Sequence, residues 1–232
     1  MRLSLLPKYL AFACAAALAG DAGAADMQFA SVAYGVERNC GDSCPRLMQA
    51  NGQITRSTPQ AFLEFARSEI QKPGLINVLL IHSPGGSVNA SIALGRVLRK
   101  LGTVVVVARA VEQGRARRGG GLGQNLRFIS GTCASACVYA LAGGLKRVVP
   151  PESKVAVHRM AGNVGQVDPA TREYQSLQIY AGDKELSALT SYIQQMGVSA
   201  DLVGIAESIP HEDARVLSQR EIARLNLAKP KL

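Results

Sequence analysis

A long apolar run, a pair of glycines and a striped helical segment follow one another in this chain, and their order constrains the fold most. Residues 75–81 are almost entirely apolar, which is typical of a strand covered on both faces. After Gly85 and Gly86, Ser87 can cap a helix over 88–101 with one apolar stripe: Ile92, Leu94, Val97 and Leu98. Residues 103–107 form a second apolar run. Strand, helix and strand in this order predict two parallel strands joined by a right-handed crossover.

The remaining pattern predicts alternating strands and helices without an internal domain boundary. Thr58 with Pro59 behind it is a helix start, and the helix over 58–71 has core-face residues at helical spacing: Phe62, Phe65, Ala66 and Ile70. We expect further strands at 27–36, 46–54, 127–130 and 154–158, a short one ending at 148–151, and a long loop at 110–125. Helices are expected at 134–142, 169–196 and 199–208, and after a capping box from Ser218 to Glu221; the long one is broken near Gly182.

The first 24 residues have the pattern of a secretory signal. Arg2 and Lys8 precede or border a short apolar stretch at 9–19, and Ala22-Gly23-Ala24 matches a cleavage site. An uncleaved anchor is the competing interpretation, and lipidation at Cys14 is disfavoured because the preceding residues lack the lipobox leucine. The pattern predicts a periplasmic or secreted protein. Cleavage would leave 208 of the 232 residues, with a strand and cysteine-bearing turn at 25–45 and one domain at 46–232.

The chain is basic, with 26 lysines and arginines against 17 acidic residues and a net charge of +9. Basic proteins often bind nucleic acid. Here the basic residues are scattered, and the one cluster, at 115–118, has no aromatic residues between its arginines. We therefore expect a solvated loop at this cluster and no nucleic-acid partner.

Four cysteines remain after cleavage: Cys40, Cys44, Cys133 and Cys137. An even number of cysteines in an exported protein indicates disulfides, and the sequence does not choose among the three possible pairings. Four thiols could also form a closed zinc site, but the two Cys-x₃-Cys spacings are not those of a zinc ribbon. We expect disulfides and no metal.

Two segments and one histidine supply the groups that an acyl-transfer hydrolase needs. Gly85 and Gly86 lie between a strand and a helix, where backbone N–H groups can approach an anion closely. Ser135 lies at a turn into a helix, which would expose its hydroxyl beside the N–H of Ala136. His158 ends a later apolar run and can act as a base. Each feature also has a structural interpretation: an ordinary turn, a helix cap and a structural histidine.

Weaker candidates lie close to these residues in sequence. The Gly-x-Ser-x-Gly elbow of many hydrolases is absent around Ser135. Cys133 or Cys137 could be a thiol nucleophile, although export and their i, i+4 spacing favour a structural role. His82 adjoins the glycines and is a second candidate base, or a residue lining the substrate groove.

Three segments in the same order resemble the proteolytic subunits of Clp protease. Residues 76–98 are similar to the segment that carries that family's oxyanion glycine, Gly131 to Ser135 to its nucleophile motif, and 144–158 to its histidine segment. The resemblance extends over residues 46–227. It implies an α/β fold of the ClpP/crotonase type, built from stacked β-β-α units. It also implies Ser135 as nucleophile, His158 as base, and the amides of Gly86 and Ala136 as oxyanion donors.

The resemblance leaves the third member of the site open. The family's aspartate lies just before a segment that is similar to residues 215–218, and the directly matching position here is Ala214. Asp213 is one residue earlier, and a one-residue bulge would bring it to the histidine. A Ser–His dyad and Asp201 are the alternatives.

Together, these features predict an exported, ATP-independent serine hydrolase that cleaves peptides or proteins and needs no cofactor. ATP is absent outside the cytoplasm, so no AAA+ unfoldase partner is expected. The family assembles through the long helix after its catalytic histidine, which implies a homo-oligomer. Two other functions remain open: a catalytically silent binding protein, favoured if a disulfide covers Ser135, and acyl-CoA chemistry of the crotonase type, although an exported chain would rarely meet CoA.

Overall fold

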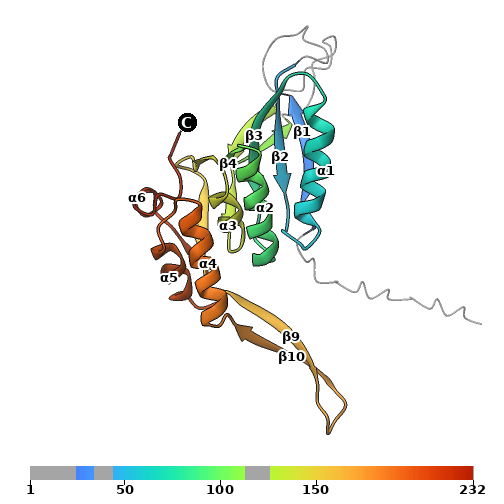
Figure 1. The fold of residues 1–232 in the computed structure, drawn as a ribbon, viewed down its shortest axis with the longest axis vertical. Helices are drawn as coiled ribbons and strands as arrows, with labels where there is room; N and C mark the ends of the chain where they lie inside the picture. Colours follow the sequence, from blue (N-terminus) through green and yellow to red (C-terminus); the bar gives the residue numbers. More distant parts are fainter. Residues whose placement is uncertain (1–24, 34–43, 113–125, 232) are drawn as a thin grey trace, which may run out of the picture.

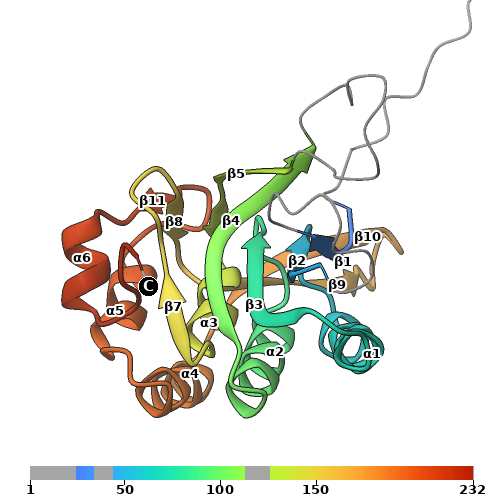
Figure 2. The same ribbon diagram turned by 90° about the horizontal axis from the view of Figure 1, so that it is seen from above.

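The computed structural model describes residues 25–33, 44–112 and 126–231. The expected signal at 1–24, Cys40 and most of the expected loop at 110–125 lie outside the described residues. A six-stranded sheet lies at the centre (Figure 1). Figure 2 shows helices α1 (Thr58–Ile70), α2 (Val88–Lys100) and α4 (Asp183–Gln195) along one side of it. The expected α/β class is confirmed.

The central sheet is mixed, with a parallel middle. Strand β1 (Gln28–Ala33) pairs antiparallel with β2 (Arg46–Asn51), which belongs to the same sheet. Strands β2, β3 (Leu75–His82), β4 (Val104–Glu112) and β7 (Lys146–Val148) run parallel. Strand β5 (Leu126–Ser130) pairs antiparallel with the far half of β4. The predicted parallel strands on either side of α2 are confirmed, and β4 extends into residues 110–112, which we expected in the loop.

Local sequence signals account for the helix starts around this sheet. The Ser87 hydroxyl accepts a hydrogen bond from Ala90 N–H, as expected of the cap of α2. In α1 the N-cap is Ser57, one residue before the predicted Thr58, with proline in the first turn. Phe62 is fully buried, but Ile70, the last residue of the helix, is 66% exposed, so its predicted place in the core was wrong.

A second, three-stranded sheet carries the segments of interest for function. It consists of β6 (Thr132–Ala134), β8 (Lys154–Val157) and β11 (Arg215–Val216), in the order β11-β8-β6. Ser83, just after β3, bridges to Cys133 in β6, so the two sheets meet at the end of β3. Helix α3 (Cys137–Ala142) follows β6 directly and is buried along its whole length. The predicted helix over 134–142 therefore begins later, because Ala134 pairs with β8 and residues 135–136 form a turn.

The predicted long helix over 169–196 is wrong. Residues 174–180 form strand β10 (Tyr174–Tyr180), which pairs antiparallel with β9 (Ala161–Val167) in a hairpin that extends away from the body (Figure 1). Tyrosines and isoleucine favour an extended backbone, and cross-strand pairing with β9 supplies hydrogen bonds that a polar helix would have to provide alone. Helix α4 starts only after Gly182, where we expected a break.

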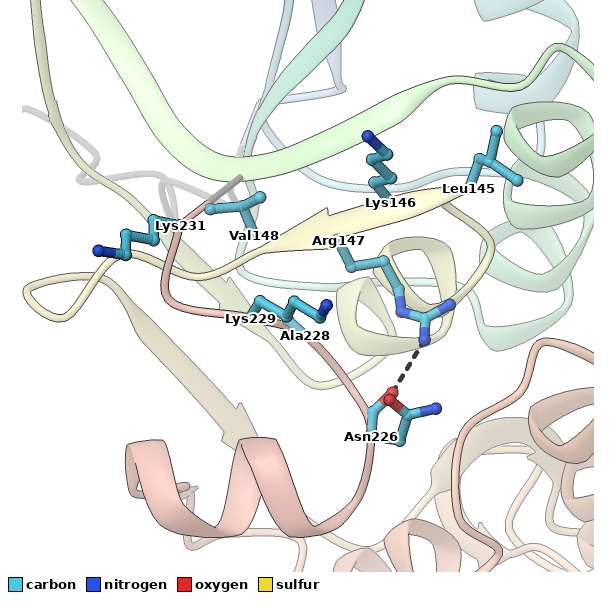
Figure 3. A pocket seen from close by; sticks show the side chains of 8 residues that line it. All are labelled: Leu145, Lys146, Arg147, Val148, Asn226, Ala228, Lys229 and Lys231. Carbon is cyan, nitrogen blue, oxygen red and sulfur yellow. Dashed lines mark hydrogen bonds between the residues drawn. The ribbon is translucent and has the colours of Figure 1, made fainter.

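The C-terminal segment lies along the free edge of β7. Helices α5 (Asp201–Glu207) and α6 (Gln219–Arg224) precede it, and Val148 bridges to Lys229. Arg147 donates through Nη2 to the carbonyl of Asn226, at 2.8 Å (Figure 3). The cavity beside this strand has a volume of about 280 Å³ and is lined by four basic residues: Lys146, Arg147, Lys229 and Lys231. None of the residues predicted for catalysis lines it.

No helix within residues 25–33, 44–112 and 126–231 combines the length and apolar character needed to cross a bilayer. In the same residues, no group of three or more His, Cys, Asp or Glu side chains is arranged to hold a metal ion.

Candidate active site

Ser135 lies in the two-residue turn between β6 and α3. Its φ is +53°, a left-handed conformation that non-glycine residues rarely adopt. Its backbone N–H donates to the carbonyl of Ala156 in β8, at 2.8 Å, which fixes the turn against the strand before His158. Strain of this kind at an otherwise well-bonded turn is typical of functional positions. The side chain is half-buried, and its hydroxyl makes no hydrogen bond to any described residue.

A disulfide joins Cys133 and Cys137 and so spans the turn that carries Ser135. This pair confirms the expectation of disulfides and removes both sulfurs as nucleophiles or metal ligands. Both cysteines are fully buried in the core, whereas Ser135 is half-exposed. The disulfide therefore supports the turn from the core side and does not cover the serine. Cys44 is disulfide-bonded as well, and Cys40 lies outside the described residues.

The glycine loop after β3 packs directly against Ser135. A Cβ placed on Gly85, whose φ is +110°, would lie 2.8 Å from the Cβ of Ser135 and 3.1 Å from the nitrogen of Ala136. Real Cβ atoms do not approach this closely, so only glycine allows the two segments to meet. Position 86, with φ +133°, also requires glycine, because a Cβ there would overlap the carbonyl of Ile54.

Two backbone amides in these adjoining segments have no acceptor among the described residues. The N–H groups of Gly86 and Ala136 make no hydrogen bond to any described residue. Gly86 is exposed, whereas Ala136, the N-cap residue of α3, is buried and directly follows Ser135. Free amide donors next to a hydroxyl are the arrangement that stabilises an oxyanion formed by attack of that hydroxyl on a carbonyl.

The glycine loop is firmly held by its neighbours. The carbonyl of Gly85 accepts from Ile54 N–H at 2.7 Å, and the carbonyl of Ile54 accepts from Ser87 N–H at 2.8 Å. The buried hydroxyl of Ser83 accepts from Gly85 N–H at 3.1 Å. Because the loop is bonded on both sides, its amides are positioned before any ligand arrives.

His158 follows β8, which pairs with β6, the strand that leads to Ser135. Ala134 lies opposite Ala156 in the parallel pair β6–β8, so Ser135 is one residue and His158 two residues beyond this pair. No hydrogen bond joins Ser135 and His158 among the described contacts. The Nδ1 atom of His158 lies instead 2.9 Å from the carbonyl of Arg159, and its ring packs edge-on against His211 with centroids 4.7 Å apart.

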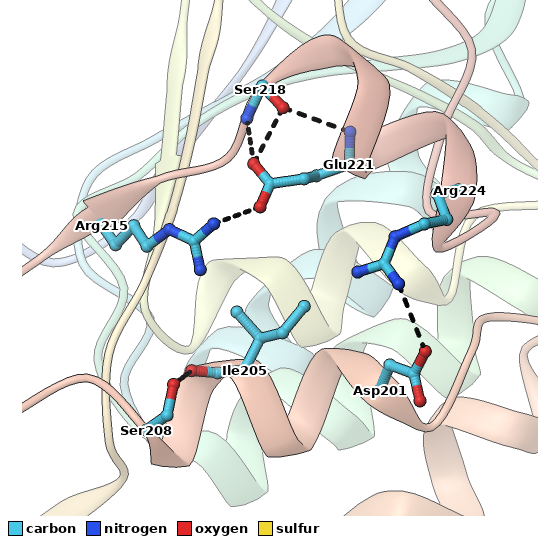
Figure 4. Close-up of polar contacts among 7 residues, drawn as sticks. All are labelled: Asp201, Ile205, Ser208, Arg215, Ser218, Glu221 and Arg224. Carbon is cyan, nitrogen blue, oxygen red and sulfur yellow. Dashed lines mark hydrogen bonds and ion pairs between the residues drawn. The ribbon is translucent and has the colours of Figure 1, made fainter.

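The two candidate aspartates do not bond to His158 in this structure. Asp213 is exposed, and its carboxylate makes no hydrogen bond or ion pair with a described residue; its backbone N–H donates to Pro210. Asp201 forms an exposed ion pair with Arg224 at 3.8 Å, as Figure 4 shows. The same figure shows the predicted capping box, in which Ser218 and Glu221 bond reciprocally and Arg215 of β11 joins Glu221.

His82 has a structural role in this arrangement. Its Nδ1 accepts a hydrogen bond from Thr132 N–H at 2.9 Å and so links the end of β3 to the start of β6. Burial, and after it the positive charge of Arg109, lower the pKa of His82 below its ordinary value. A neutral imidazole is required for this bond because a protonated Nδ1 could not accept.

Sequence reasoning did not single out His211 as part of the site. It is the third histidine of the chain, after His82 and His158. One feature of the sequence could have indicated its role. His211 lies two residues before Asp213, in the segment that we expected to contribute the orienting carboxylate.

The chain was compared with known proteins. No family model matches it, and no curated protein matches it in sequence. A variant of the 1510-N membrane-bound stomatin-specific protease is similar in structure, with a TM-score of 0.49, 17% identity, and coverage of 78% of this chain and 75% of that one. Another variant of that protease, in complex with a substrate peptide, has a TM-score of 0.47 and 16% identity over 78% of this chain and 71% of that one.

A variant of ClpP1 from Listeria monocytogenes is also similar, with a TM-score of 0.41 and 14% identity, covering 76% of this chain and 84% of that one. At these identities the likeness concerns the fold, and scores below 0.5 add nothing about the roles of individual residues. Those roles rest on the geometry around Ser135.

Proposed function

We propose that this protein is a serine hydrolase that cleaves peptide bonds. Ser135 attacks the scissile carbonyl while His158 takes the hydroxyl proton through Nε2. The N–H groups of Gly86 and Ala136 hold the oxyanion that develops. His158 then gives the proton to the leaving amine, and water releases the acyl group from Ser135 by the reverse use of the same groups.

One observation supports the proposal most strongly. Two backbone amides that have no acceptor within the described part of the chain lie in segments that meet at a serine of positive φ. An ordinary helix cap needs neither the strained φ nor the close approach of Gly85. Backbone donors are worth about 3–4 kcal/mol of transition-state stabilisation each in hydrolases of this kind. The fixed glycine loop supplies them without reorganisation.

The cellular setting is part of the same proposal. The signal at 1–24 and the disulfide between Cys133 and Cys137 support an exported protein in an oxidising compartment, periplasmic or secreted. Substrates would be peptides or unfolded proteins, without an AAA+ unfoldase, a cofactor or nucleic acid. We also propose a homo-oligomer. The helix we expected to mediate it is partly a hairpin, so we assign the contact to β9 and β10.

Labelling with a fluorophosphonate probe tests the chemistry. Purified mature protein is compared with Ser135→Ala, His158→Ala and the matched surface variant Ser68→Ala, whose serine is exposed on α1. We expect labelling of the wild type and of Ser68→Ala, and its loss in the other two. Peptide-library profiling of the labelled enzyme would then define the substrate.

A catalytically silent binding protein is the second candidate, and one observation favours it. No hydrogen bond joins Ser135 to His158, whereas an assembled pair would have one. Apo enzymes often lack this bond until substrate binds. Folded wild type that resists the probe, both with and without mild reductant, would favour the binding protein and would reject hydrolysis.

A further inference from the structure

We propose that His211 is a positioning residue for His158, acting through the backbone carbonyl of Arg159. The inference deepens the proposed function and rests on it, because it assigns the group that orients the base. A histidine and a main-chain carbonyl would take the place that an aspartate holds in a Ser–His–Asp triad.

The geometry centres on a single oxygen. The carbonyl of Arg159 lies 2.9 Å from Nδ1 of His158 and 3.1 Å from Nδ1 of His211. A carbonyl can only accept, and it has two lone pairs, so both imidazoles must donate to it through Nδ1–H. The two rings then meet edge to face, with centroids 4.7 Å apart.

This arrangement fixes the tautomer of the proposed base. With its hydrogen on Nδ1, neutral His158 carries an unprotonated Nε2, and no described residue donates to that atom. An unprotonated Nε2 is what a general base needs to accept the Ser135 proton. The Arg159 carbonyl thus holds the ring in the competent tautomer, as a carboxylate does in a triad.

The carbonyl is itself held in place by the segment that carries His211. Arg159 N–H donates to the carbonyl of Ile209 at 2.8 Å. The Arg159 side chain donates through Nε to the carbonyl of Glu207 at 3.0 Å, and Met160 N–H donates to the Glu207 carboxylate at 3.0 Å. The last bond of this set is the one from Nδ1 of His211 to the second lone pair of the Arg159 carbonyl oxygen. Hydrogen bonds to residues 207–211 therefore fix the peptide group whose carbonyl orients His158.

The tautomer can be measured without any substrate. Long-range ¹H–¹⁵N spectra of the neutral imidazoles distinguish a protonated Nδ1 from a protonated Nε2. We expect His158 to be in the Nδ1–H form in the wild type, and in a mixture of both forms in His211→Phe, which keeps a ring but has no donor. His211→Asn, whose amide can donate from a similar place, should restore the wild-type spectrum.

The fluorophosphonate labelling rate provides the second readout. We expect about a tenfold slower rate in His211→Phe, recovery in His211→Asn, and no change in the adjacent exposed variant Glu212→Gln, with thermal melting confirming that each variant folds. Three results would overturn the inference: an Nε2–H His158 in the wild type, unchanged labelling in His211→Phe, or loss of labelling in Asp213→Asn alone.

The two readouts separate this inference from the proposed function. If the wild type shows Nδ1–H at His158 and His211→Phe shows a mixture of tautomers, but the wild type does not react with the probe, hydrolysis would be rejected while the orienting role of Arg159 and His211 would be confirmed. A reactive wild type with the other tautomer would confirm hydrolysis and reject the role of His211.

Discussion

Cys133 and Cys137 are joined by a disulfide across the turn that holds Ser135 at a φ of +53°. The loop that it closes has only five residues, so the loop-entropy relation gives a contribution of about 2 kcal/mol to the free energy of unfolding. The double variant Cys133→Ala, Cys137→Ala should lose this stability. It should also label with fluorophosphonate about tenfold more slowly, because the strained turn can relax.

Chemical denaturation and labelling of the same preparation measure the two effects together. Labelling at the wild-type rate in a destabilised variant would show that the disulfide supports the fold and not the position of the serine.

The contact between Gly85 and Ser135 gives a sharper test of the site. A Cβ at Gly85 would lie 2.7 Å from the carbonyl of Ala134 and 2.8 Å from the Cβ of Ser135. Gly85→Ala must therefore push the two segments apart and displace the amides of Gly86 and Ala136, so we expect about a 100-fold slower labelling rate. Gly204→Ala is the matched control because nothing lies within 4 Å of a Cβ there. Equal rates in both variants would contradict the oxyanion assignment.

Gly95 in α2 is required by Tyr192 of α4 for a similar steric reason. A Cβ at Gly95 would overlap the Tyr192 hydroxyl, which donates to the carbonyl of Tyr139 at 2.8 Å. Gly95→Ala should lower the free energy of unfolding by about 1–3 kcal/mol, as overpacked cores do. In Tyr192→Phe, which lacks the hydroxyl, the same substitution should cost clearly less. A double-mutant cycle from urea unfolding measures the difference, and additive effects would show that the overlap is relieved elsewhere.

The bond between His82 and Thr132 predicts a pH dependence of stability. Because burial lowers the pKa of His82 in the folded protein, the unfolded chain binds the proton more readily. The stability that neutral His82 contributes is therefore complete above its unfolded pKa and is lost as the pH falls through its folded pKa. In His82→Asn, whose carbonyl can accept from Thr132 without titrating, melting temperatures should fall less between pH 8 and pH 5. Parallel curves for the two proteins would argue against this role.

Local sequence signals predicted where several helices begin. They failed where a segment became a strand by pairing with another strand. Ser87 and the Ser218 capping box begin α2 and α6 as expected, because a cap depends on residues three apart in sequence. Residues 174–180 were predicted to be helical, but they pair with β9, and such a partner is invisible to a pattern read along one segment.

In the candidate site, too, some residues could be predicted from the sequence and others could not. The order of motifs predicts that Ser135, His158 and the glycine loop form one site. The orienting group was not predictable, because it depends on which oxygen the Nδ1 atom of His158 meets, and that oxygen is a main-chain carbonyl that every residue has. Residues 207–211 and Arg159 are about 50 residues apart in sequence, so only the three-dimensional structure shows that they are hydrogen-bonded to each other.

The hairpin of β9 and β10 exposes more apolar surface than a monomer needs. Six of its large apolar side chains are exposed: Val164, Val167, Tyr174, Leu177, Ile179 and Tyr180. In the register of the hairpin, Leu177 lies opposite Val164, and Ile179 shares their face; Tyr174 and Val167 lie on the other face. A lone two-stranded hairpin is at best marginally stable, and exposed apolar patches of this kind usually mark contacts with another protein.

A second copy of the chain is the partner we expect, because two such hairpins could pair through their open edges and bury the same residues on each side. Light scattering should show an oligomer for the wild type and a monomer for the double variant Leu177→Gln, Ile179→Thr. Ile70→Gln, which removes a still more exposed isoleucine from the end of α1, should leave the oligomer intact. A monomeric wild type would reject the assembly, and an oligomer that survives the hairpin variant would place the contact elsewhere on the surface.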